Sequence, residues 1–191
     1  IGAGSWGTAV CWLLGGKGVP VTLWSREPEI AAGINAEHRN PVYLRDVVLP
    51  ESTYATPDIQ EAVSGAEAVV VVTPSHGVRG VAEAMSGSLP AHVPIVNLSK
   101  GIEAGSLFRM TQVLEDVLGN RDRLAALSGP NHAEEVSKGV PSATAIAAYD
   151  DAVARMFQDL FMSPVFRVYT NPDVIRVELG GAPTNAIAAA A

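Results

Sequence analysis

Hydrophobic and polar positions follow two alternating patterns along this chain. Short runs of β-branched and other apolar residues predict strands, and apolar residues that recur every three to four positions between them predict amphipathic helices. The predicted strands lie at 19–24, 53–56, 66–73, 92–99, 123–127, 142–148 and 166–170, and the main helices at 5–14, 27–40, 57–63, 78–85, 105–118 and 152–162. Strands alternating with helices predict an α/β fold, doubly wound around a mainly parallel sheet.

The first eight residues contain the spacing G-x-G-x-x-G, directly ahead of the first predicted helix. Gly2 allows a sharp turn, Gly4 has no Cβ and lets a pyrophosphate approach the backbone, and Gly7 lets the helix pack close to its strand. The start of the helix offers backbone N–H groups and the positive end of its dipole to phosphates. Because a second strand follows at βαβ distance, the context favours a Rossmann-like dinucleotide site over a plain strand–helix turn.

The strand that should lead into this glycine loop is not present ahead of Ile1. A Rossmann unit places that strand at the centre of its sheet. We therefore expect a few apolar residues to precede Ile1 in the natural protein, and N-terminal sequencing tests this hypothesis.

The residues that follow the second predicted strand bear on the choice of cofactor. An acidic side chain at this point would accept a hydrogen bond from the ribose 2′-hydroxyl of NAD. This chain has Ser25 and Arg26, with Glu27 and Glu29 just beyond. A guanidinium can pair with a 2′-phosphate and stack on adenine, so Arg26 favours NADP over NAD. The alternative is that Arg26 is a solvated loop cation.

Later strands bring further polar residues to the carboxyl edge of the predicted sheet, where ligands of such folds bind. Lys100 follows one strand and could reach a ligand at the nicotinamide site, and Gly101 beside it permits a tight turn. The loop over 128–132 precedes a helix start that could hold an anion. His76 follows another strand, and a helix-start or solvated role is expected for it rather than that of a base.

Composition limits the classes of function. The 191 residues are 48% hydrophobic, enough for one domain with a sizeable core, and carry a net charge of −7. This charge argues against nucleic-acid binding through a basic surface and against an anionic membrane surface as partner. No apolar run is long enough to span a bilayer and no signal peptide is visible, so a cytoplasmic protein is expected. The lone Cys11 excludes an internal disulfide and is predicted to be a core residue, and the four histidines lack a metal-ligand spacing, so no metal site is expected.

Seven motifs run in order along the chain: GAGSWGTA at 2–9, LWSR at 23–26, NPVYL at 40–44, SKGIE at 99–103, LSGPNHAEE at 127–135, FRVY at 166–169 and VELGGA at 177–182. Together they resemble the bacterial-type NAD(P)-dependent sn-glycerol-3-phosphate dehydrogenases. The resemblance implies a Rossmann-like NAD(P)-binding domain at 1–171, with its first strand truncated, and the start of an all-helical substrate-binding domain at 172–191. It also implies reversible hydride transfer between the cofactor, NADP or NAD, and dihydroxyacetone phosphate, which gives sn-glycerol 3-phosphate for phospholipid synthesis. The oligomeric state, a homodimer included, stays open.

By motif position, the resemblance implies cofactor contacts from Gly2, Gly4, Ser5, Trp6, Gly7, Arg26, Tyr43, Lys100 and Ala133. It implies substrate contacts from Lys100, Gly129, Asn131 and Asn185. Hydride addition to the C2 carbonyl places negative charge on its oxygen, and a cation or acid there stabilises the transition state and supplies the proton. A lysine such as Lys100 can do both.

The family has a second lysine, its acid/base, at the position that Thr184 occupies here. Threonine carries no positive charge and is no acid near neutral pH, and losing a general acid/base commonly costs about 10²–10⁴ in rate. Three explanations are open: a misread end of the sequence, a deliberate substitution, or a catalytically weak relative. Two alternative functions follow, a cofactor-binding sensor without catalysis and a two-domain dehydrogenase acting on another keto or hydroxy substrate. Turnover after Thr184→Lys tests the sensor alternative. Dependence of the reaction on the substrate phosphate tests the alternative of a different substrate.

Overall fold

The computed structural model of the chain describes residues 1–180. The helices are α1 (Ser5–Gly15), α2 (Pro28–Glu37), α3 (Ile59–Val63), α4 (Val78–Met85), α5 (Met110–Leu118), α6 (Ala133–Val136) and α7 (Asp151–Phe161), with short 3₁₀ turns η1 (Ser75–Gly77) and η2 (Arg121–Arg123). The strands are β1 (Val21–Trp24), β2 (Thr53–Thr56), β3 (Val69–Val71), β4 (Ile95–Asn97), β5 (Leu124–Ser128), β6 (Ser142–Ala148) and β7 (Phe166–Thr170). A further helical segment covers 174–180.

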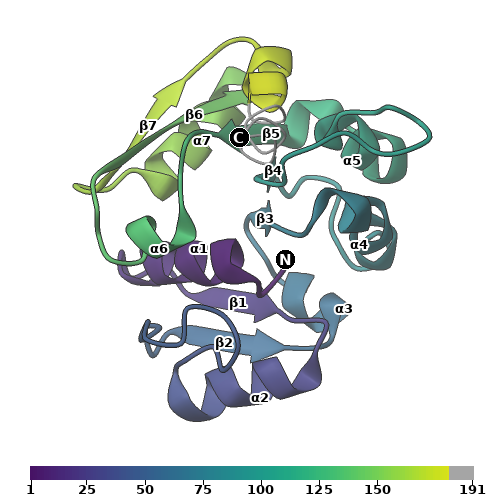
Figure 1. Cartoon of the computed structure of the whole chain (residues 1–191). Helices are drawn as coiled ribbons and strands as arrows, with labels where there is room; N and C mark the ends of the chain where they lie inside the picture. Colours follow the sequence, from purple (N-terminus) through teal and green to yellow (C-terminus); the bar gives the residue numbers. More distant parts are fainter. Residues whose placement is uncertain (181–191) are drawn as a thin grey trace.

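The strands form two adjacent sheets, a pair β1-β2 and a sheet of order β3-β4-β5-β6-β7. Every neighbouring pair is parallel except β5 and β6, which run antiparallel. Figure 1 shows the β1-β2 pair below, with α2 beneath it, and the larger sheet fanned out above. The predicted α/β class with a mainly parallel sheet is therefore confirmed.

The first residues of the chain lie between the two sheets (Figure 1). The Gly2 N–H donates to the Trp24 carbonyl at the end of β1 over 3.1 Å, and the Val72 N–H just after β3 donates to the Ile1 carbonyl over 2.9 Å. Hydrogen bonds to the ends of β1 and β3 therefore hold the glycine loop from both sides. The expectation of apolar residues ahead of Ile1 stays a prediction.

Helix α1 packs on the core that lies between it, α7 and the larger sheet. Leu13 and Leu14 of α1 share this core with Phe157 and Phe161 of α7 and with Phe166 of β7, all of them buried. Burial of one such side chain stabilises the fold by about 1.5–3 kcal/mol. The opposite side of α1 packs on β1 and α2 through the buried thiol of Cys11, which confirms its expected place in the core.

The predicted helix over 105–118 is wrong in its first turn, because α5 begins only at Met110. Gly105 has φ +94°, and Leu107 has φ +60° and is 76% exposed instead of facing the core. The Glu103 N–H donates to the Phe108 carbonyl and the Leu107 N–H to the Glu103 carbonyl, which closes a tight loop ahead of the helix. The apolar period of the sequence runs on past Gly105, whose backbone breaks the helix, and the Gln112 side chain caps the true start of α5.

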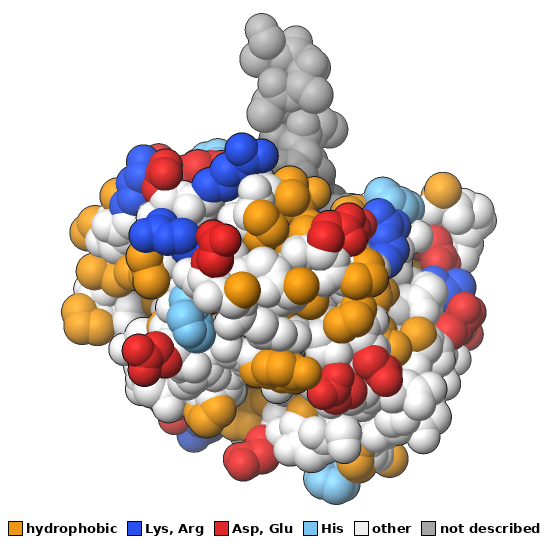
Figure 2. Space-filling model, turned by 90° about the horizontal axis from the view of Figure 1, so that it is seen from below, with side chains coloured by type: hydrophobic (Ala, Val, Ile, Leu, Met, Phe, Trp, Pro, Cys, Tyr) orange, Lys and Arg blue, Asp and Glu red, His pale blue; other side chains and the backbone are white. Residues whose placement is uncertain are grey.

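Within residues 1–180, no helix is long and apolar enough to cross a membrane. Figure 2 shows the face on the side of α2 and β2. On this face basic side chains lie next to acidic ones, and no continuous basic area forms.

Candidate nucleotide-binding cleft

A cleft of about 640 Å³ opens at the carboxyl ends of β1, β3, β4 and β5. Its volume lies within the range of ligand sites in proteins. Most of the predicted site residues line it together: Gly2, Gly4, Ser5, Trp6, Arg26, Tyr43, Lys100, Gly129 and Asn131. The fold therefore gathers residues from five separate motifs around one space.

The three glycines of the first loop meet three different surroundings. A Cβ on Gly4 would meet no atom within 4 Å, so the backbone is open to the cleft there. Gly2 has φ +116°, which favours glycine, and a Cβ on Gly7 would lie 1.8 Å from the Gly2 carbonyl oxygen. Gly7 thus permits the close packing of α1 on the loop, and it does not line the cleft.

The start of α1 suits a phosphate group. Gly4 is its N-cap and provides no side-chain hydrogen bond, and the first turn carries no acidic residue. The N–H groups of that turn therefore have no capping side chain and no acidic residue within the turn, and Gly4, Ser5 and Trp6 line the cleft. Such a helix start binds anions, so the residues present fit the pyrophosphate of a dinucleotide.

Asn40 holds the loop that carries Tyr43 against the glycine loop. The fully buried Asn40 amide donates to the Ala3 carbonyl and to the Thr8 hydroxyl, each over 2.9 Å. Its Oδ1 accepts the N–H groups of Val42 and Tyr43 at 3.0 and 2.9 Å. Since one side chain satisfies four partners, Tyr43 is fixed at the cleft. No role was predicted for Asn40, although Asn40 is the first residue of the motif at 40–44.

Lys100 is placed by the turn that follows β4. The Asn97 side chain bonds both the N–H and the carbonyl of Ser99, at 3.2 and 2.9 Å, and the Ser99 hydroxyl donates to the Thr73 carbonyl. Gly101 has φ +138°, and a Cβ there would lie 2.8 Å from the Ser75 hydroxyl oxygen. The turn brings the Lys100 ammonium within 3.0 Å of the Gly129 carbonyl, to which it donates. Partial burial lowers the pKa of Lys100 below the ordinary lysine value.

Near Lys100, two buried side-chain atoms have no hydrogen-bond partner among the described residues. The Asn131 Oδ1 and the Thr144 hydroxyl of β6 are buried and make no hydrogen bond there. Gly129 leaves no room for a side chain, since a Cβ would lie 2.8 Å from the Thr144 hydroxyl oxygen. Buried polar atoms without partners are uncommon, and the side chains that carry these two lie next to Gly129, which lines the cleft.

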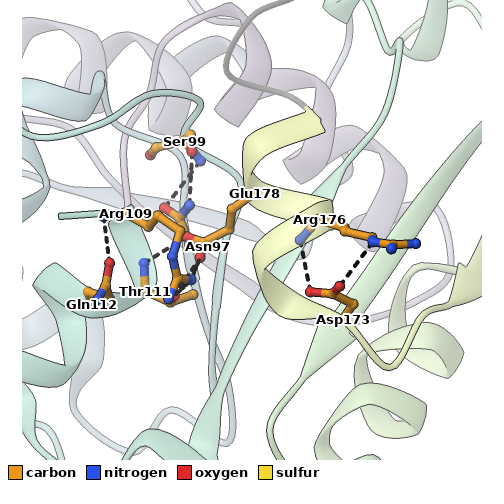
Figure 3. Close-up of polar contacts among 8 residues, drawn as sticks. All are labelled: Asn97, Ser99, Arg109, Thr111, Gln112, Asp173, Arg176 and Glu178. Atoms are coloured by element: carbon orange, nitrogen blue, oxygen red, sulfur yellow. Dashed lines mark hydrogen bonds and ion pairs between the residues drawn. The ribbon is translucent and has the colours of Figure 1, made fainter. Parts of the chain in front are cut away.

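A buried ion pair ties the segment at 174–180 to α5, beside the turn that places Lys100 (Figure 3). Glu178 pairs with Arg109 and also accepts the N–H and hydroxyl of Thr111, at 2.8 and 2.6 Å. The Glu178 and Arg109 side chains are only 6% and 13% exposed. The sequence pattern gave no signal for this contact, because the partners lie 69 positions apart.

Four predicted residues lie away from the cleft lining or outside the described part. Gly7 packs beneath the loop, and Ala133 is buried at the start of α6. Thr184 and Asn185 fall outside the described residues. The lining also includes residues that were not predicted for the site, among them Trp24, Glu27 and the segment 72–77. Most of these follow a strand end, and that position is the signal that could have found them.

A mainly parallel α/β sheet with a glycine loop and a cleft at its carboxyl edge defines the class of Rossmann-type nucleotide-binding domains. Residues 1–154 match the family model described as NAD-dependent glycerol-3-phosphate dehydrogenase N-terminus. The chain belongs to this family, and the predicted resemblance is confirmed.

Individual relatives agree with the family match. Over 190 residues the chain is 48% identical to glycerol-3-phosphate dehydrogenase, NAD(P)+, of Moorella thermoacetica, and the match covers 100% of this chain and 56% of that protein. The enzyme of the same name from Myxococcus xanthus is 45% identical, with 100% and 58% covered. The crystal structure of glycerol-3-phosphate dehydrogenase from Coxiella burnetii superposes with a TM-score of 0.88 at 34% identity, covering 94% of this chain and 55% of that one. The chain thus spans a little over half the length of these relatives.

Proposed function

We propose that this chain forms the cofactor-binding part of an enzyme that transfers a hydride between a nicotinamide cofactor and the C2 carbon of dihydroxyacetone phosphate, giving sn-glycerol 3-phosphate. The observation that carries the proposal is the single cleft shared by the glycine loop and Lys100. The names of the relatives support the same reaction. In this proposal the nucleotide-binding domain covers 1–171, and 172–191 begins a helical substrate-binding domain.

The geometry of the cleft supports the proposed cofactor roles. The open backbone at Gly4 and the first turn of α1, with Ser5 and Trp6, would hold the pyrophosphate. Tyr43 would border the cofactor, since the Asn40 bonds fix its backbone at the cleft. Ala133, at the start of α6, is proposed as a backbone contact. When bound, the reduced nicotinamide supplies the hydride.

Lys100 would act on the substrate carbonyl. Its ammonium group would hydrogen-bond the C2 oxygen and stabilise the negative charge that develops there. Its lowered pKa makes proton donation to that oxygen easier than for an exposed lysine. Gly129, whose carbonyl accepts a hydrogen bond from the Lys100 ammonium, and Asn131, which also lines the cleft, are proposed as substrate contacts beside it. Asn185 is proposed as a further substrate contact.

NADP is proposed as the preferred cofactor, because Arg26 lines the cleft at the end of β1. Arg26→Ala is expected to weaken NADPH binding much more than NADH binding, since only NADPH carries the 2′-phosphate. Titration of the chain with each reduced cofactor measures both affinities. Equal weakening of the two would show that Arg26 does not contact the 2′-phosphate.

The reaction is tested with the protein as its gene encodes it. Dihydroxyacetone phosphate should be reduced with NADPH, and unphosphorylated dihydroxyacetone should not. Reduction of both compounds at similar rates would contradict the proposed substrate. Cofactor binding without turnover, unrepaired by Thr184→Lys, would instead favour a cofactor-binding sensor.

A further inference from the structure

Arg26 and Glu27 form an ion pair at the end of the cleft that β1 borders. The Arg26 Nε and Nη2 donate to the same Glu27 carboxylate oxygen over 3.0 and 2.8 Å. Both residues line the cleft, and their side chains are 82% and 40% exposed. The guanidinium proposed for the 2′-phosphate is therefore already engaged by a carboxylate.

The backbone fixes this pair in place. The buried Ser25 donates its N–H to the Thr56 carbonyl over 3.0 Å and its hydroxyl to the Glu27 carbonyl over 3.1 Å. Pro28 then begins α2 directly after Glu27. The turn that carries the two charged side chains is therefore anchored before and after them at the cleft.

Glu27 is the N-cap of α2, but its side chain accepts no hydrogen bond from that helix. An N-cap side chain commonly satisfies the free N–H groups of the first turn. Here the Glu27 carboxylate accepts hydrogen bonds from Arg26 instead, so its position depends on Arg26 and not on α2.

The two side chains favour opposite cofactors. A 2′-phosphate binds a guanidinium and is repelled by a carboxylate, whereas a ribose 2′-hydroxyl donates a hydrogen bond to a carboxylate. For Arg26 to hold a 2′-phosphate, it must give up part of its contact with Glu27 or bring the phosphate close to that carboxylate. Both bonds from Arg26 go to one oxygen of Glu27, so the other carboxylate oxygen could accept the 2′-hydroxyl of NAD while the pair stays intact.

We propose that Glu27 is a specificity-determining residue of the cofactor site, which restrains Arg26, opposes the 2′-phosphate and so limits the preference for NADP(H) over NAD(H). The inference rests on the proposed function, because it concerns the same cofactor. It assigns the preference for NADP to Arg26 and the limit on that preference to Glu27.

The test is Glu27→Gln, which keeps the size of the side chain and removes its charge. Titrations of the purified chain with NADPH and NADH, followed by the fluorescence of the reduced nicotinamide, give the ratio of the two affinities. We expect the substitution to raise the NADPH-to-NADH affinity ratio by roughly two- to fivefold, the range that corresponds to an exposed ion pair. Adenosine 2′,5′-bisphosphate and AMP, which differ only in the 2′-phosphate, should show the same shift as competitors.

Glu29→Gln is the matched control, since it removes the same charge in the first turn of α2 from a side chain outside the cleft lining. Its affinity ratio should stay at that of the unsubstituted chain. An unchanged ratio in Glu27→Gln, or an equal shift in Glu29→Gln, would overturn the inference and leave the proposed function standing. If the unsubstituted chain binds neither cofactor, both are wrong.

Discussion

The buried carboxylate of Glu178 gives the largest single-residue effect that we expect on stability. Glu178→Gln removes the charge that pairs with Arg109, whose side chain is only 13% exposed. An uncompensated buried charge commonly costs roughly 3–5 kcal/mol, so the free energy of unfolding should fall by an amount of that order. Urea denaturation of the two proteins measures the difference.

Arg176→Ala on the same helical segment provides the comparison. Its ion pair with Asp173 is solvent-exposed, with 83% of the Arg176 side chain accessible. Such pairs contribute at most about 1 kcal/mol, so this variant should unfold near the unsubstituted chain. Similar losses in both variants would mean that burial of the Glu178 pair is not the cause.

Lys100 is the residue on which the proposed chemistry depends most. Lys100→Ala should lower the rate of reduction by about 10²–10⁴, because the transition-state oxygen loses its cation and proton donor. Circular dichroism should be unchanged. Lys138→Ala, which removes an exposed lysine after α6, is the control for a general charge effect. Normal turnover in Lys100→Ala would exclude Lys100 from the site.

At the scale of elements, two glycines of the loop that starts α1 are expected to affect different properties, Gly7 the stability of the fold and Gly4 the binding of the cofactor. Gly7→Ala would place a Cβ 1.8 Å from the Gly2 carbonyl oxygen, so α1 must shift, and overpacking of this kind costs about 1–3 kcal/mol. Gly4→Ala meets no atom within 4 Å and should leave stability nearly unchanged, yet its methyl group would occupy the space proposed for the pyrophosphate. Thermal unfolding and NADPH titration of both variants check this contrast. Full NADPH affinity in Gly4→Ala would place the phosphates elsewhere.

The loop between β4 and α5 is stabilised by the ion pair between Arg79 and Glu103, and this stabilisation depends on pH. Arg79 donates to both oxygens of Glu103 over 2.8 and 2.9 Å, and with the Ser106 hydroxyl it lowers the pKa of Glu103 to about 2. A depressed carboxyl pKa stabilises the fold above the unfolded value near 4.3, and this stabilisation is lost as pH falls toward 2. Glu103→Gln should therefore be less stable than the unsubstituted chain at pH 7, and the gap should close in acid.

Urea denaturation at several pH values between 7 and 2 measures that gap. Glu83→Gln makes the same charge change on an exposed position of α4 and serves as the control. A gap that stayed constant down to the lowest pH would contradict the role given to the Glu103 charge.

At the scale of the whole molecule, the cleft lies where the ends of β1 in the small sheet and of β3, β4 and β5 in the large sheet meet. A dinucleotide bound there would contact both sheets and stabilise the folded chain by linkage. At 100 times its Kd, NADPH should add about 2.7 kcal/mol and raise Tm by roughly 5–10 °C. Thermal scans with inorganic pyrophosphate alone are the control, and an equal shift with pyrophosphate would indicate phosphate binding without recognition of the dinucleotide.

The sequence by itself determined the class of fold and most of the cleft. Alternating apolar runs predict strands and helices, and strand ends of a parallel sheet share one edge, so Gly4, Arg26 and Lys100 could be assigned to one site from their positions alone. The seven motifs between 2 and 182, in their order along the chain, also indicated the family. These features depend on neighbouring residues or on the order of elements along the chain, and both can be read directly from the sequence.

The tertiary structure decided which polar side chains support that site. Asn40 and Glu178 are polar residues that a pattern assigns to the surface, yet both are buried, because each meets partners 32 to 69 positions away. The start of α5 at Met110 was likewise decided by loop bonds that close over Glu103 and Phe108. Hydrogen bonds between distant segments leave no periodic trace in the sequence, so only the folded chain reveals them.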